Sequence, residues 1–188
     1  MNTDDWLTII TVLGLGSLGV LVGASFVGII MASRRVQKFP VLKKGRAFSW
    51  HLWGTVTIGF ALLLHSLLSL NTTERTGITW VNILIPFTAP QETLLLGIGS
   101  IALYLLILTI AVSLTIRKKH QKIWRTLHYG TYIALILGTI HGLFISSTFQ
   151  HDWAFDMFDA EKIAVELSIL LIIISVVYRI IWTKTKKA

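Results

Sequence analysis

Four histidines lie within apolar stretches of this 188-residue chain, and they form two pairs along the sequence. His51 and His65 are 14 residues apart, and His128 and His141 are 13 residues apart. An ionisable side chain inside a membrane segment is expensive to keep, so it usually has a partner or a function. Imidazole is a frequent axial ligand of haem iron. Two pairs on two separate segments therefore suggest four axial ligands, enough for two haems stacked across a membrane.

Other chemistries for these histidines differ in what they require of the rest of the chain. The absence of cysteine excludes disulfides, cysteine-ligated iron–sulfur clusters, covalent haem attachment and a thiolate-ligated haem. Zinc or copper is disfavoured because two histidines without carboxylates or thiolates leave such a metal under-ligated. Two alternatives stay open. One is a haem-free transporter or proton pathway in which the histidines titrate, with Glu166 as the main other ionisable residue of the spans. The other is a structural or haem-sensing membrane subunit.

Long apolar runs must position these histidines. Hydrophobic residues make up 54% of the chain and charged residues 14%, against about 25% charged residues in soluble domains. Runs of about 20 apolar residues are long enough to cross a bilayer as helices. We therefore predict an all-α integral membrane bundle, a single domain over residues 1–188. Its five spans are expected at Trp6–Ala32, Phe48–Leu70, Leu94–Thr115, Ile123–Ile145 and Ile163–Trp182.

Charge distribution orients the predicted spans. Of the 17 Lys and Arg residues, 15 lie in the loops at 34–46 and 117–125 or at the C-terminal end, and only Arg75 and Lys162 lie on the other side. All nine Asp and Glu residues fall on that other side. The positive-inside rule then places the N-terminus outside and the C-terminus in the cytoplasm. The same asymmetry accounts for the net charge of +8, so no nucleic-acid partner is expected.

This topology pairs the histidines across helices. The second and fourth spans both run from inside to outside, with His51 and His128 near the inner edge. His65 and His141 lie 14 and 13 residues further along, a rise of about 20 Å on each helix. His51 is thus expected to face His128, and His65 to face His141. Each pair could hold one haem iron, giving an inner and an outer haem.

Helical phase fits one of the two histidine spacings better than the other. A separation of 14 residues returns to within about 40° of the same helix face, whereas 13 residues leave an offset of about 140°. A local distortion of the fourth span would reduce that offset. Gly130 and Gly138 are the candidate places for it.

Cations near the expected haem edges are candidate partners for haem propionates. Arg46 precedes His51 by five residues, and Arg125 precedes His128 by three, so both belong to the inner edge. Arg75 is the one evident cation for the outer haem. All three also serve to set topology.

Two apolar stretches have other expected roles. The run Gly77–Phe87 is too short to span and is followed by Pro90, so we expect an interfacial or re-entrant segment that covers the outer face. The first span carries Gly14, Gly16, Gly19, Gly23 and Gly28. Small residues allow helices to pack closely in lipid, and we interpret these glycines as a packing surface.

Two features of the sequence resemble those of a known family. They are the histidine spacings of 14 and 13 on alternate spans and the stretch Arg-Lys-Lys-His-Gln-Lys-Ile-Trp-Arg-Thr-Leu-His, which leads into the second pair. On these residues the chain resembles the ferric reductase-like transmembrane domain superfamily. That superfamily includes the NADPH oxidases, the ferric-chelate reductases and the haem subunit of the bacterial methionine sulfoxide reductase system. The similarity extends from about the first basic loop to the fifth span.

The resemblance implies two b-type haems, one on His51 and His128 and one on His65 and His141. It also implies electron flow from a cytosolic flavin to an acceptor outside, in a bacterial cytoplasmic membrane. The family's oxidases continue into FAD- and NADPH-binding domains, but no glycine-rich dinucleotide motif occurs here in a soluble setting. We therefore expect the haem membrane subunit of an oxidoreductase, served by a separate flavoprotein reductase or another donor. Ferric iron, oxygen or a partner protein would be the extracytoplasmic acceptor.

Overall fold

In the computed structural model, all regular secondary structure of the described residues is helical. The structure describes residues 3–32 and 44–145, together with residues 162–163, 165–166, 169–174 and 177. The long helices are α1 (Thr3–Ala32), α2 (Lys44–Leu68), α5 (Thr93–Thr115), α6 (Gln121–His128) and α7 (Gly130–Ile145). Three short elements, η3 (Ser69–Thr72), α3 (Thr73–Thr76) and α4 (Trp80–Leu84), connect α2 to α5.

Four helical segments of the described chain are long and apolar enough to cross a membrane, as expected of an integral membrane protein. They are residues 3–32, 45–76, 93–115 and 121–145, which contain the first four predicted spans almost completely. The fifth predicted span lies partly outside the described residues. Its described pieces are helical, Val165 is fully buried, and Leu171 and Ile172 pack against the core. The basic loop at 34–43 and the connection at 146–161 lie outside the described residues.

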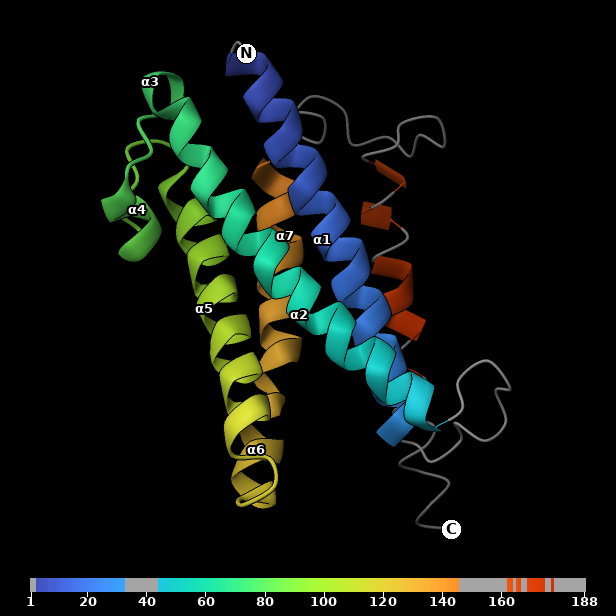
Figure 1. The fold of residues 1–188 in the computed structure, drawn as a ribbon. Coiled ribbons are helices and arrows are strands. Elements are labelled where there is room, and N and C mark those ends of the chain that lie inside the picture. The colour runs from blue at the N-terminus through green and yellow to red at the C-terminus, as the bar shows by residue number, and fades with distance from the viewer. Residues whose placement is uncertain are drawn as a thin grey trace.

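Two helical hairpins build the bundle and cross each other at an angle (Figure 1). The first hairpin packs α1 against α2, and the second packs α5 against α7, with α6 at the turn. In the first hairpin α2 carries the histidines, and in the second hairpin α6 and α7 together carry them. The remaining helix, α1 in the first hairpin and α5 in the second, packs against the histidine-bearing helices and is called the supporting helix. This division determines how every histidine is held.

An apolar core joins the two hairpins midway between the histidine levels. Leu21, Ile58 and Leu106 are buried there, with 1–6% of their surface exposed. They pack with other buried residues of α1 and α7, namely Leu18, Val22, Ala24, Ala134 and Leu135. Ile58 stands midway between His51 and His65 in the sequence, so this core fills the space between the two levels.

A short break separates α6 from α7 immediately after His128. The N–H of Tyr129 donates to the carbonyl of Thr126 at 3.2 Å, and the N–H of Tyr132 donates to that of Tyr129 at 3.1 Å. These three-residue steps are typical of a 3₁₀ turn, which advances about 120° per residue rather than about 100°. The expected distortion is therefore present beside Gly130, the first residue of α7. Gly138, the other candidate, lies inside α7.

The segment between α2 and α5 starts at the end of the bundle where the N-terminus lies and places α4 beside α5 (Figure 1). Gly77, at a φ of 69°, adopts the left-handed conformation that ends α3. Helix α4 is a single turn, too short to span, and exposes the large apolar side chains of Trp80 and Leu84. The hydroxyl of Tyr104 on α5 lies 2.8 and 2.7 Å from the carbonyls of Ile83 and Leu84, which anchors α4 to the bundle.

Candidate functional site: two imidazole pairs

The four membrane histidines meet as two cross-helix pairs. The ring centroids of His51 and His128 are 6.0 Å apart with planes inclined at 71°. Those of His65 and His141 are 6.4 Å apart with planes inclined at 89°. We call the first pair the inner level and the second the outer level, after the predicted topology. The structure thus brings together the residues that the sequence predicted to face each other, although their role as ligands remains a prediction.

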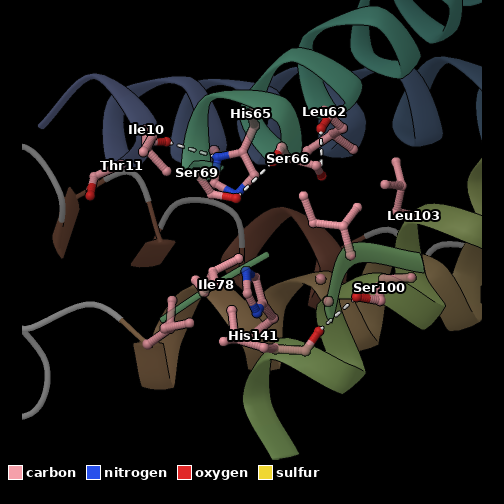
Figure 2. A pocket seen from close by; sticks show the side chains of 18 of the residues that line it. Ile10, Thr11, Leu62, His65, Ser66, Ser69, Ile78, Ser100, Leu103 and His141 are labelled. Atoms are coloured by element: carbon pink, nitrogen blue, oxygen red, sulfur yellow. Dashed lines mark hydrogen bonds between the residues drawn. The ribbon is translucent and has the colours of Figure 1, made fainter. Parts of the chain in front are cut away.

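A cavity of about 550 Å³ opens around the outer level. In Figure 2 the side chains of His65 and His141 point toward one another across it. Its wall includes Leu62 and Leu103, and its other end reaches the polar groups of Gln91 and Arg75. The volume lies within the range of about 300–1,000 Å³ typical of cofactor and ligand sites. Ile78, Asn82 and Ile83 also line the cavity, so part of the predicted interfacial segment forms its wall.

Three of the histidines are tied to backbone carbonyls of the supporting helices. Nδ1 of His51 lies 2.8 Å from the carbonyl oxygen of Ala24, and Nδ1 of His65 lies 2.9 Å from that of Ile10, both on α1. Nδ1 of His141 lies 2.9 Å from the carbonyl oxygen of Leu95 on α5. A carbonyl can only accept, so Nδ1 must carry the proton in each case. Nε2 is then left with its lone pair, which is the form in which imidazole binds a metal.

Each of these three rings also packs against a glycine of the supporting helix. A Cβ atom on Gly28 would lie 3.1 Å from Cε1 of His51, and one on Gly14 would lie 3.0 Å from Cε1 of His65. One on Gly99 would lie 2.7 Å from Nδ1 of His141. In contrast, a Cβ on Gly16, Gly19 or Gly23 would meet no atom of another described element within 4 Å. The glycines of the first span are therefore not one uniform packing surface, because two of them accommodate imidazoles.

His128 is held differently from the other three. Its Nδ1 lies 3.4 Å from the hydroxyl oxygen of Ser113 on α5. The indole Nε1–H of Trp124 donates to the same oxygen at 3.1 Å. The Trp124 and His128 rings lie 5.1 Å apart and are inclined by 30°, so the indole also flanks the imidazole. Trp124 belongs to the stretch that carried the family resemblance, and its structural partner is Ser113.

The three predicted propionate partners are all exposed at the ends of the bundle. Arg75 lines the outer cavity and forms an ion pair with Asp4 on α1. Arg46 and Arg125 are exposed on α2 and α6, one to two turns from His51 and His128. The side chain of Arg117 also lies at this end, 4.7 Å from the ring of Phe48 in a cation–π contact. The roles of Arg46, Arg125 and Arg75 toward propionates remain predictions.

The donor set fits haem better than a free metal ion. Two imidazoles bound to opposite sides of one metal, with metal–nitrogen distances of about 2 Å, place their ring centres about 6 Å apart. The separations of 6.0 and 6.4 Å agree with that value. Among the residues that the structure describes, no group of three or more His, Cys, Asp or Glu side chains could hold a bare metal ion. Porphyrin nitrogens would supply the four ligands that each pair lacks.

Fold and site together define a helical membrane bundle with two stacked imidazole pairs about 20 Å apart along its helices. No protein-family model, curated protein or solved structure matches the chain.

Sequence reasoning identified the four histidines but missed the residues that hold them. These are the carbonyls of Ile10, Ala24 and Leu95, the glycines Gly14, Gly28 and Gly99, and the hydroxyl of Ser113. One signal was available. Gly14 and Gly28 are 14 residues apart, as are His51 and His65 on the antiparallel helix.

Proposed function

We propose that this chain is the haem-bearing membrane subunit of an oxidoreductase. It would carry electrons from a cytoplasmic donor, such as a flavoprotein reductase, to an acceptor on the other side of the membrane. One observation carries this proposal: at each of two levels, two imidazole rings face each other, with ring centroids 6.0 Å apart at one level and 6.4 Å apart at the other. The resemblance to the ferric reductase-like transmembrane superfamily supports the same function and favours a bacterial cytoplasmic membrane.

When bound, haem iron held by two imidazoles supplies one-electron redox chemistry and has no free position for an external ligand. The chain contributes the surroundings. The carbonyls of Ile10, Ala24 and Leu95 keep three imidazoles in the metal-binding tautomer. His51 and His128 would hold the inner haem, and His65 and His141 the outer haem.

The core between the levels and the cavity at the outer level have complementary roles. Ile58, Leu106 and their buried neighbours form an apolar core in the middle of the bundle, between the two levels. At the outer end, the cavity extends from the imidazoles to Arg75 and Gln91 at the protein surface. An acceptor could therefore approach the outer level from outside without entering the membrane core.

Haem content and spectra test this function. The full chain, purified with haem supplied during expression, should bind about two haems and give the reduced-minus-oxidised bands of low-spin b-type haem. Since the ring planes are inclined at 71° and 89°, the ferric protein should give the strongly anisotropic low-spin EPR signal of crossed imidazoles. His141→Ala should remove one haem and leave the inner one, because the levels are about 20 Å apart.

Protein purified after expression with haem supplied, but without these bands, would refute the proposal. If that protein instead supported pH-dependent ion flux in vesicles, the histidines would belong to a transport pathway. Bound haem that no flavoprotein or chemical donor of low potential can reduce would indicate a structural or sensing subunit.

A further inference from the structure

The residues that hold the four histidines follow one register. Gly14 and Gly28 on α1 are 14 residues apart, and so are Gly99 and Ser113 on α5. Each of these four positions touches a different histidine. We call them the seat positions. The two hairpins therefore repeat one arrangement, in which a supporting helix carries two seats with the same spacing.

Helix geometry explains why glycine occupies a seat. In all three glycine seats, the carbonyl that binds Nδ1 belongs to the residue four positions earlier: Ile10 for Gly14, Ala24 for Gly28 and Leu95 for Gly99. The Cα–Cβ bond of a helical residue tilts toward the N-terminus, so its side chain covers the preceding turn. A glycine leaves that turn open, and the imidazole can reach the carbonyl from the side.

Ser113 occupies the fourth seat position and is the one seat residue that is not glycine. The residue four positions before it is Thr109, whose carbonyl lies under the Ser113 side chain by the same geometry. Here the hydroxyl takes the place of the carbonyl as partner of Nδ1. A hydroxyl oxygen can accept two hydrogen bonds, and Trp124 already donates one at 3.1 Å. The contact to His128 is longer, 3.4 Å against 2.8–2.9 Å at the glycine seats.

We propose that residues 14, 28, 99 and 113 are positioning residues that orient the four imidazoles, and that the carbonyls left open at the three glycine seats also fix the tautomer of their imidazoles. At the fourth seat, Nδ1–H of His128 donates to the Ser113 hydroxyl, which also accepts from Trp124, and His128 is the more weakly polarised ligand of the inner pair. A partner that accepts from Nδ1–H increases the basicity of Nε2 as a ligand. The redox part of this inference rests on the haem function proposed above. The hydrogen-bonding part concerns the protein alone.

Substitutions at Ser113 distinguish the two hydrogen-bond acceptors available to His128, namely the hydroxyl of Ser113 and the carbonyl of Thr109. Ser113→Gly should turn the fourth seat into a glycine seat and expose the carbonyl of Thr109 to Nδ1 of His128. Ser113→Ala removes the hydroxyl but still covers that carbonyl. The first variant should therefore keep Nδ1–H hydrogen-bonded, and the second should leave it without an acceptor. Gly16→Ala on α1 is the matched control, because its new methyl group meets no atom of another element within 4 Å in the part of the chain that the structure describes.

Two measurements on the full chain in lipid nanodiscs test the inference. Solid-state ¹⁵N NMR of labelled histidines reports tautomer and hydrogen bonding with or without haem. Redox titration reports the midpoint potential of each haem. Ser113→Gly should lower the potential of the inner haem alone. Ser113→Ala should raise it and weaken inner haem binding by about 10-fold or more, as for other lost partners of metal-bound histidine.

The outcomes distinguish this inference from the proposed function. Two haems together with identical His128 signals and potentials in wild type, Ser113→Gly and Ser113→Ala would overturn the seats and leave the function standing. No haem in the wild type, but His128 signals that respond as described, would overturn the function and support the seats. If Ser113→Ala fails to fold, the same NMR comparison of Gly28→Ala with Gly16→Ala at His51 decides the matter, and identical His51 signals would overturn the inference.

Discussion

Gly99→Ala should be the most damaging of the three glycine-to-alanine changes at the seats. The new Cβ would lie 2.7 Å from Nδ1, 2.8 Å from Cε1 and 2.9 Å from Cγ of His141. Reaching an ordinary carbon contact of about 3.5 Å requires the ring to retreat by roughly 0.7–0.8 Å. The bond from Nδ1 to the carbonyl of Leu95, now 2.9 Å, would then exceed the hydrogen-bonding limit.

The same reasoning ranks the other two seats below Gly99. At Gly14 and Gly28 the shortest Cβ contacts are 3.0 and 3.1 Å, so the rings need to retreat by only about 0.4–0.5 Å. Their hydrogen bonds would lengthen but survive. A lost bond of this kind is worth about 0.5–1.5 kcal/mol in stability and about 10–100-fold in metal affinity. Gly99→Ala should therefore reduce outer haem occupancy strongly, and Gly14→Ala only mildly.

Haem titration and ¹⁵N NMR of His141 would measure this effect. Gly138→Ala is the matched control, because Gly138 also lines the outer cavity but its new methyl group meets no other helix within 4 Å among the described residues. That variant should leave the Nδ1–H signal of His141 unchanged. Equal effects of Gly99→Ala and Gly138→Ala would refute the reasoning, since they would show that only the filling of the cavity matters.

Three further predictions concern the surroundings of the levels. Arg75→Gln should shift the outer haem potential whereas Asp4→Asn should not, if Arg75 faces a propionate. Both should change thermal stability by less than about 1 kcal/mol, because their ion pair is exposed, and equal potentials in both variants would argue against the propionate contact. Leu106→Ala should destabilise the bundle by about 2–5 kcal/mol in denaturant unfolding in detergent, because it leaves a cavity in the core, and an unchanged midpoint would contradict that packing. Tyr104→Phe should release α4 and speed hydrogen exchange at Ile83 relative to wild type, because it removes a hydroxyl worth about 1 kcal/mol, and unaltered exchange would show that α4 is held by other contacts.

The sequence by itself was enough to predict the first four helical spans and which histidines share a level. Hydropathy is a local property, so the first four spans could be placed to within a few residues of the helices observed. Charge asymmetry predicted a direction for each span, and that predicted topology paired His51 with His128 and His65 with His141, as the structure does. The need for a distortion after His128 was also foreseeable, because a 13-residue spacing does not fit one face of an ideal helix.

Only the tertiary structure decided which residues hold the imidazoles. Five glycines on the first span look alike in the sequence, yet Gly14 and Gly28 contact histidines and Gly16, Gly19 and Gly23 do not. The difference depends on how α1 is rotated about its axis and how far it is shifted along α2, and both follow from packing between distant segments. The same holds for Ser113, whose partner His128 lies on the next helix. Backbone carbonyls have no sequence signature, so the partners of the histidines became visible only once the hairpins were packed.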